Sequence, residues 1–126
     1  MTLSTGNSPV KTLFLDRDGV INRRIPGGYV TSIDDLKLFP GVTADIALLN
    51  RFFHRIIIVS NQQGVGKGIM SCDDVDKVHV FLKNKIESEG GTIDGIYFCP
   101  ALASDNDPFR GMVYGKDHYL KPGQDK

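Results

Sequence analysis

Near the start of the chain, a short apolar run ends abruptly in two carboxylates, and this pattern limits which folds the chain can adopt. Residues 13–15 are Leu-Phe-Leu, and Asp16-Arg-Asp-Gly19 follows them directly. Such an uninterrupted run predicts a parallel β-strand that is covered on both faces. In open α/β sheets, ligands bind just beyond the carboxyl ends of such strands. Asp16 and Asp18 are therefore predicted to lie at the functional edge of a sheet.

Further apolar runs predict that strands and helices alternate along the chain. Residues 56–59 and 93–98 favour two more strands, and the first of these ends in Ser60-Asn61. The spacing of apolar residues predicts helices over residues 42–53 and 73–89. A glycine-rich loop, residues 62–68, follows the second strand. Because strand-helix-strand crossovers are right-handed, this order predicts half of a doubly wound α/β sheet.

The second predicted helix has clear signals at both ends. Ser71 is a suitable N-cap, and acidic residues follow it in the first turn. Gly90-Gly91 ends the helix. The stripe expected to be buried consists of Val75, Val78, Leu82 and Ile86.

Composition narrows the class of protein. The 126 residues suit one domain, with residues 1–9 as a polar leader. Fifteen basic and fifteen acidic residues give a formal net charge of zero, which argues against a nucleic-acid partner. No apolar run reaches the length of a membrane span and the first residues do not form a signal peptide, so we expect no membrane partner and a cytoplasmic location. We expect Cys72 and Cys99 to be reduced thiols.

The two aspartates suggest phosphate chemistry. A carboxylate at a strand end can attack phosphorus and form an acyl phosphate, which divides one difficult displacement into two easier ones. A second carboxylate two residues later can protonate the leaving oxygen and then activate water. Mg²⁺ held by oxygen ligands would offset the repulsion between the two groups. The alternative is that Asp16-Arg-Asp-Gly19 is only a polar turn after a buried strand.

Several stretches together resemble one family. Asp16-Arg-Asp-Gly-Val-Ile-Asn22 is similar to the first motif of the haloacid-dehalogenase-like (HAD) phosphatase superfamily, in the form found in the branch of heptose-bisphosphate and histidinol phosphatases. Four more stretches resemble that branch in the same order. They are Gly28-Tyr-Val30, Phe39-Pro-Gly-Val42, Ser60-Asn-Gln-Gln-Gly-Val-Gly-Lys-Gly68 and Ile96-Tyr-Phe-Cys-Pro100.

The resemblance implies a fold and an activity. The fold is a Rossmann-like, HAD-like three-layer α/β sandwich with a parallel sheet. The activity is magnesium-dependent hydrolysis of a small phosphorylated metabolite, D-glycero-D-manno-heptose 1,7-bisphosphate, through an aspartyl-phosphate intermediate; histidinol phosphate is the second candidate substrate. The interval between Asp18 and Ser60 holds a loop and one helix but not an inserted cap domain, so we expect an open, capless site.

Family roles carry over to individual positions. Asp16 matches the nucleophile and a magnesium ligand, and Asp18 matches the general acid/base, whose backbone carbonyl also reaches the metal. Ser60 matches the residue that hydrogen-bonds the transferring phosphoryl group, with Asn61 beside it. Lys121 matches the lysine that neutralises phosphate and nucleophile; the alternative is a solvated lysine near the chain end.

The chain departs from the family pattern in two ways. The fourth motif, an acidic group that completes the magnesium site, has no counterpart before Lys126, so we expect the natural chain to continue with further strands. The zinc loop of heptose-bisphosphate phosphatases is reduced to Cys99, and one thiolate cannot make a tetrahedral site. No structural zinc is therefore expected.

Other functions remain to be weighed. The segment around Lys67 is a poor nucleotide-binding loop, because Asn61 and Gly68 stand where that motif needs glycine and Ser/Thr. Arg23, Arg24 and Lys67 could contact a distal anionic group of the substrate, or could be solvated surface residues. A catalytically inactive binding or regulatory module is the alternative to an enzyme.

Two further expectations concern the histidines and the sheet edge. His54, His79 and His118 have no metal-ligand spacing, which favours surface or helix-face positions. A bare edge beside the first strand could pair with a second copy of the chain.

Overall fold

The computed structural model describes residues 9–101, which form one parallel sheet and the segments that connect its strands. The strand order is β1-β2-β3. The strands are β1 (Thr12–Asp16), β2 (Arg55–Asn61) and β3 (Gly95–Cys99). The helices are α1 (Val42–Leu49), α2 (Gln63–Gly66) and α3 (Cys72–Ser88), with the 3-10 turn η2 (Ile33–Asp35) before α1. The α/β class is confirmed.

The register of the sheet brings the polar strand ends together. Asp16 at the end of β1 pairs with Val59, and Ser60 and Asn61 then complete β2. Asn61 pairs in turn with Cys99 at the end of β3. Because all three strands are parallel, their carboxyl ends share one edge, and this edge carries the predicted site residues.

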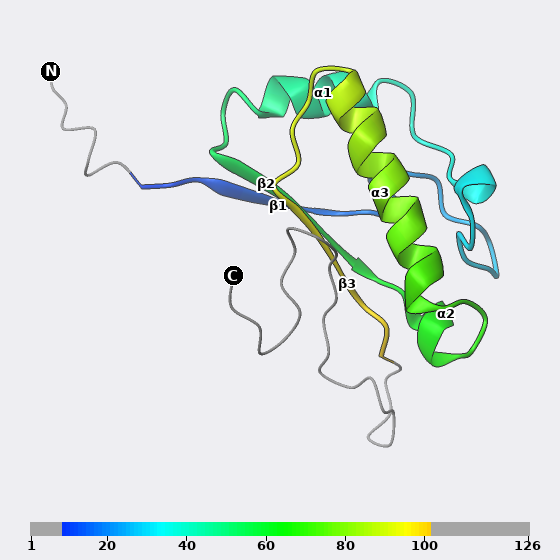
Figure 1. Cartoon of the computed structure of the whole chain (residues 1–126). Helices are drawn as coiled ribbons and strands as arrows, with labels where there is room; N and C mark the ends of the chain where they lie inside the picture. Colours follow the sequence, from blue (N-terminus) through cyan, green and yellow to red (C-terminus); the bar gives the residue numbers. More distant parts are fainter. Residues whose placement is uncertain (1–8, 102–126) are drawn as a thin grey trace, which may run out of the picture.

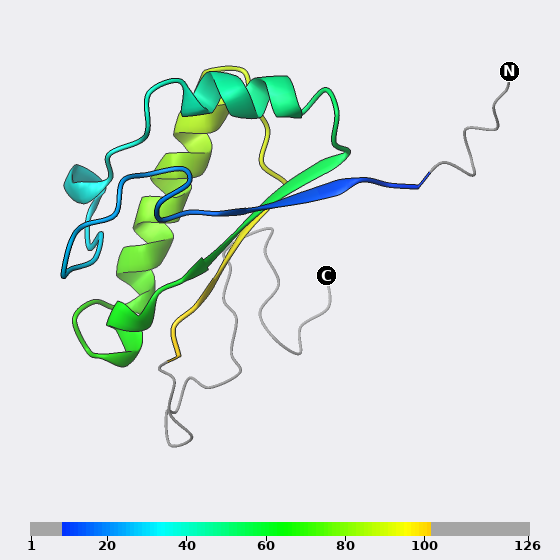
Figure 2. The same cartoon turned by 180° about the vertical axis from the view of Figure 1, so that it is seen from behind.

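Helices α1 and α3 lie on the same side of the sheet, as both opposite views show (Figures 1 and 2). Alternate strand residues point towards them and form the core, since side chains alternate between the faces of a strand. The fully or nearly fully buried members of this core include Ile46, Ile56, Ile58, Val78, Leu82, Ile86 and Ile96.

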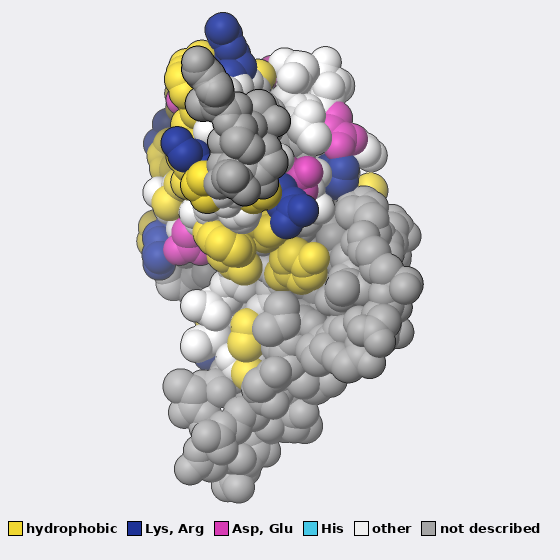
Figure 3. Space-filling model, turned by 90° about the vertical axis from the view of Figure 1, so that its left-hand side faces the viewer, with side chains coloured by type: hydrophobic (Ala, Val, Ile, Leu, Met, Phe, Trp, Pro, Cys, Tyr) yellow, Lys and Arg dark blue, Asp and Glu magenta, His cyan; other side chains and the backbone are white. Residues whose placement is uncertain are grey.

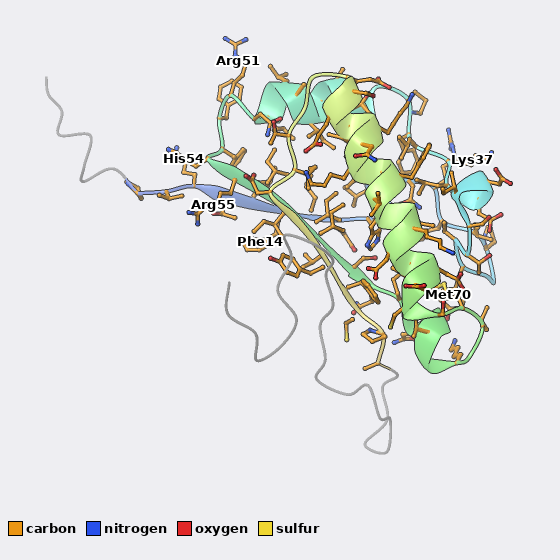
Figure 4. The ribbon with its side chains drawn as sticks, in the orientation of Figure 1. Phe14, Lys37, Arg51, His54, Arg55 and Met70 are labelled. Carbon is orange, nitrogen blue, oxygen red and sulfur yellow. The ribbon has the colours of Figure 1, made fainter. Side chains whose placement is uncertain are left out.

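The prediction that the first strand is covered on both faces is wrong for the described part of the chain. Phe14 is 61% exposed and lies on the side of β1 away from α1 and α3 (Figure 4). The physical reason is that both crossovers run over the same face, so residues 9–101 supply no helix to the other one.

Helix α3 forms where capping and periodicity agree. The Ser71 hydroxyl accepts a hydrogen bond from the backbone N–H of Asp74 at 3.1 Å, and the Asp74 carboxylate accepts one from the backbone N–H of Ser71 at 2.9 Å. This reciprocal capping box satisfies two groups that the helix itself cannot pair. All four residues of the predicted stripe are buried.

Three predicted segments need correction. The first helix ends at Leu49 rather than Phe53, because i→i+3 hydrogen bonds such as Arg51 N–H to Leu48 carbonyl tighten the chain before it enters β2. Part of the glycine-rich loop is the single-turn helix α2. The third strand begins at Gly95, since the Asp94 carboxylate accepts the N–H of Ile56 at 2.8 Å in place of a ladder bond.

The start of β1 is a mixed apolar and basic surface. Seen from this end of the molecule, hydrophobic side chains are exposed between lysines and arginines (Figure 3). Within residues 9–101, β1 has a strand neighbour on one side only. Pairing of a second copy at the other side stays a prediction, which light scattering would test. No helix in the described range is long and apolar enough to span a bilayer.

Candidate active site

A cavity of about 680 Å³ opens at the carboxyl edge of the sheet. Asp16 and Asp18 form one wall, the loop from Arg24 to Val30 forms another, and Asn61 and Lys67 contribute from the segment after β2. A second cavity of about 340 Å³ shares Asp16 and Asn61 with the first. It is lined also by Ser60. The structure therefore brings the two aspartates and the predicted phosphate-binding pair to neighbouring hollows that meet at Asp16.

The carboxylate of Asp18 is held by four hydrogen bonds. Its Oδ1 accepts from Arg17 Nη2 at 2.8 Å, from Arg17 Nε at 3.2 Å and from Asn22 Nδ2 at 2.9 Å. Its Oδ2 accepts from Gln62 Nε2 at 2.9 Å. Gly19, the next residue, has φ +88°, a left-handed conformation that glycine adopts without strain and that lets the chain turn here. The Asp18 side chain is thereby fixed in one orientation beside the cavity.

The surroundings of Asp18 favour its ionised form. Burial raises the pKa of this carboxyl, but the charge of Arg17 and the hydrogen bonds from Asn22, Arg17 and Gln62 lower it by more. The net result is a pKa below the ordinary value of 3.8. In the ligand-free chain, Asp18 is therefore a carboxylate at neutral pH.

Arg17, between the two aspartates, points into the protein and is completely buried. Besides its contacts to Asp18, its Nη1 lies 3.1 Å from Nε2 of His79 on α3. His79 is also buried, and burial together with the positive charge of Arg17 lowers the pKa of its imidazole from 6.5 to about 3. Of the two expected positions, His79 takes the helix face rather than the surface, since it lies on the buried face of α3. His54 is exposed, as predicted.

Gln62 connects the two strand ends. Its Nε2 donates to Asp18 Oδ2 at 2.9 Å and to Ser60 Oγ at 2.7 Å, and the side chain is completely buried. Ser60 is buried as well, with 6% exposure. The hydroxyl of Ser60 is therefore positioned relative to Asp18 through a single bridging amide.

Asp16 differs from Asp18 in its surroundings. It is exposed at the end of β1, and its Oδ1 accepts the backbone N–H of Arg17 at 3.1 Å. Asp16 lines both cavities. It is thus the more accessible of the two carboxylates, which suits a group that must reach a ligand.

The three predicted substrate-loop cations lie in different surroundings. Arg24 and Lys67 line the larger cavity, and Lys67 Nζ donates to the hydroxyl of Tyr29 at 2.8 Å across it. Arg23 does not line this cavity; its guanidinium lies 5.1 Å from the centre of the Phe39 ring. The structure thus brings two of the three towards the aspartates.

Known proteins are similar to this chain in sequence. No protein-family model matches the chain. It is 44% identical over 88 residues to a D-glycero-alpha-D-manno-heptose-1,7-bisphosphate 7-phosphatase of Mycobacterium tuberculosis, a match that covers 70% of this chain and 46% of that protein. It is 39% identical over 100 residues to a D-glycero-beta-D-manno-heptose-1,7-bisphosphate 7-phosphatase of Rhodopseudomonas palustris, covering 79% and 53%. The chain spans about half the length of the curated relatives it matches.

Solved structures agree with the sequence matches. The D,D-heptose 1,7-bisphosphate phosphatase of B. bronchiseptica, complexed with magnesium and phosphate, superimposes with a TM-score of 0.71 at 28% identity, over 77% of this chain and 54% of that one. A HAD-like phosphatase of Mesorhizobium loti gives a TM-score of 0.69 at 27% identity, over 79% and 47%. The fold is that of the HAD-like superfamily. The predicted resemblance to its heptose-bisphosphate phosphatases is confirmed.

Two residues singled out in the sequence fall outside the described residues. Lys121 and His118 lie beyond residue 101, so their predicted positions are not tested. Across residues 9–101, no three His, Cys, Asp or Glu side chains cluster in a way that could hold a metal ion. Cys72 and Cys99 form no disulfide.

Sequence reasoning missed four residues of the hydrogen-bond network around Asp18. They are Arg17, Asn22, Gln62 and His79. His79 could have been found, because it falls four residues after Val75 and three before Leu82, on the predicted buried stripe. Gln62 carried no such signal, since its bridging role depends on how β1 and β2 pair.

Proposed function

We propose that this chain carries the catalytic edge of a magnesium-dependent phosphatase that hydrolyses a small sugar phosphate through an aspartyl-phosphate intermediate. The substrate we propose is D-glycero-D-manno-heptose 1,7-bisphosphate. The observation that carries the proposal is the contrast between the aspartates. Asp16 is exposed to both cavities, whereas Asp18, two residues on, is ionised and held by four hydrogen bonds.

Asp16 and Asp18 have different roles in the proposed reaction. An oxygen of Asp16 attacks phosphorus, the bond from phosphorus to the sugar oxygen breaks, and Asp18 gives a proton to that oxygen. Asp18 then accepts a proton from water, which attacks the phosphorus of the intermediate and releases phosphate and Asp16. Each step moves one proton to or from Asp18, so its fixed orientation favours both.

The hydrogen bonds indicate where Asp18 carries its proton. Oδ1 already accepts three hydrogen bonds, whereas Oδ2 accepts one, from Gln62. The transferable proton is therefore assigned to Oδ2. Asp18 is ionised in the ligand-free chain, and the negative charge of an incoming phosphate raises the pKa of a neighbouring carboxyl. Substrate binding thus favours the acid form that the first step needs.

The donors at the strand end fit Mg²⁺. This ion prefers oxygen ligands, and it is commonly bound by one or two carboxylates, waters and substrate phosphates. Asp16 has an exposed carboxylate for this purpose, and the backbone carbonyl of Asp18 is the second proposed donor, because its carboxylate is engaged by Arg17, Asn22 and Gln62. When bound, the ion would neutralise charge on the phosphoryl oxygens and on Asp16.

Other residues are assigned to substrate binding. Ser60 and Asn61 line the hollow beside Asp16 and are proposed to bind the transferring phosphoryl group, with Lys121 neutralising its charge. Arg24 and Lys67, which line the larger cavity but not the smaller one, are proposed to bind the second phosphate of the bisphosphate. A substrate with two anionic groups would use both ends of this site.

Phosphate release tests the function directly. We expect the chain with Mg²⁺ to release phosphate from heptose 1,7-bisphosphate, and Asp16→Asn or removal of the metal to abolish release. Asp34→Asn, an exposed aspartate of η2, is the matched control and should keep full activity. Binding of the bisphosphate without release would identify a catalytically inactive binding module. Faster release from histidinol phosphate would identify the other branch.

A further inference from the structure

Helix α3 passes over the end of β1 in both views of the fold (Figures 1 and 2). At this crossing, His79 of α3 lies against Arg17, the residue between the two aspartates. The contact joins Nε2 of His79 to Nη1 of Arg17 at 3.1 Å, inside the protein. His79 lines neither cavity and belongs to no step of the proposed chemistry.

The arginine is held from two sides. Nε and Nη2 donate to Oδ1 of Asp18, and Nη1 faces His79. An arginine guanidinium has only donors, so Nε2 of His79 must be the acceptor and the imidazole proton must lie on Nδ1. The low pKa of the imidazole agrees with this neutral form. The guanidinium is thereby fixed in the plane that presents two N–H groups to Asp18.

A purely structural histidine does not explain this arrangement well. Nδ1 of His79 is buried and has no hydrogen-bond partner among the described residues. A buried donor without a partner costs about 1–3 kcal/mol, which an apolar side chain on the same stripe would avoid. Its neighbours on the stripe, Val75, Val78 and Leu82, are all apolar. An apolar residue at this position could not accept the hydrogen bond that His79 accepts from Arg17.

We propose that His79 is a positioning residue, which accepts a hydrogen bond from Arg17 and so keeps the guanidinium in the orientation that fixes the Asp18 carboxylate. Its effect on turnover rests on the proposed phosphatase function. Without the acceptor, the guanidinium rotates and Asp18 loses its alignment. Since His79 and Arg17 lie outside the cavity walls, substrate binding should hardly change.

The matched variants are His79→Leu, which removes the acceptor, and His79→Gln, whose side-chain oxygen can take the place of Nε2. Val80→Ala, the next and exposed position of α3, is the control. For His79→Leu we expect kcat to fall by about 10- to 100-fold, as for other residues that orient a functional group, with KM changed less than about twofold. His79→Gln should recover most of the loss.

A second measurement needs neither metal nor turnover. In ¹⁵N-labelled chain, the Arg17 Nε–H signal should exchange slowly with water in the wild type and in His79→Gln, and at least about tenfold faster in His79→Leu. Equal protection in both variants would overturn the proposal, as would equal loss in both. If no apolar variant folds, His79→Met included, while His79→Gln does, the role is structural instead. A wild-type chain without turnover would count against the proposed function, and the exchange rates would still decide the role of His79.

Discussion

Nη2 of Arg17 lies 2.8 Å from Oδ1 of Asp18, and the arginine that makes this contact is completely buried. The positive charge that balances Asp18 thus comes from its neighbour in sequence and is itself removed from water. A buried charge is tolerated only when it is paired, so each member of the pair depends on the other.

Replacing Arg17 should therefore destabilise the fold. Arg17→Met leaves Asp18 without its ion-pair partner and His79 without its donor. Removal of one member of a buried pair costs up to about 3–5 kcal/mol, and Asp18 is 27% exposed and keeps its hydrogen bonds from Asn22 and Gln62. Urea unfolding of the two chains would measure the loss. Arg23→Met is the matched control, because that arginine is exposed and only stacks on Phe39, an interaction worth about 1 kcal/mol or less. Equal stability of Arg17→Met and the wild type would contradict the buried pair.

The buried imidazole predicts how stability depends on pH. The pKa of His79 is about 3 in the folded chain and near 6.5 when unfolded, so between these values the unfolded chain binds more protons. Stability must then fall as the pH is lowered through this window, by about 2–3 kcal/mol between pH 6.5 and 4.5. Asp18 does not contribute there, because its pKa lies below 3.8.

His79→Gln isolates this effect, since every other titrating group is unchanged. Unfolding by urea at a series of pH values should give a flatter profile for the variant than for the wild type. Profiles that run parallel from pH 6.5 to 4.5 would mean that His79 is not buried in its neutral form.

Gly64 packs closely against Tyr29, which lines the larger cavity. A Cβ at this position would lie 3.1 Å from Cγ of Tyr29 and 2.8 Å from the terminal methyl of Met70. The methyl group can move aside, whereas the Tyr29 ring, which lines the cavity, would have to shift by a few tenths of an ångström. We expect Gly64→Ala to weaken binding of the sugar bisphosphate on the order of tenfold, measured by calorimetry.

Tyr29→Phe separates the ring from its hydroxyl. It keeps the packing on Gly64 and removes only the acceptor for Lys67. Binding by Tyr29→Phe should therefore be weakened less than binding by Gly64→Ala. The reverse order would show that the hydroxyl contact, not the space above Gly64, determines the shape of the cavity.

The sequence alone predicted the features that depend on residues close together in the chain. The β-branched run before Ser60 predicted β2, and the Ser71 cap with its apolar stripe predicted α3 to within one residue at each end. Asp16 ends β1 and Asp18 comes two residues later, so their place at the sheet edge followed from the strand itself.

What the sequence could not supply depends on contacts between distant segments. His79 meets Arg17 because α3 crosses β1, and Gln62 meets Asp18 because β1 and β2 pair in one register. Arg23 and Arg24 are adjacent in sequence, yet one stacks on Phe39 and the other lines the cavity. The sequence around each of these residues does not show which contact the residue makes in the folded chain.

Asp16 should become phosphorylated during turnover. Acid quenching of the reaction with Mg²⁺ and heptose 1,7-bisphosphate, followed by peptide mass spectrometry, should find one phosphoryl group on Asp16 and none in Asp16→Asn. Turnover that proceeds with the phosphoryl group on another residue, or with none at all, would show that Asp16 is not the nucleophile.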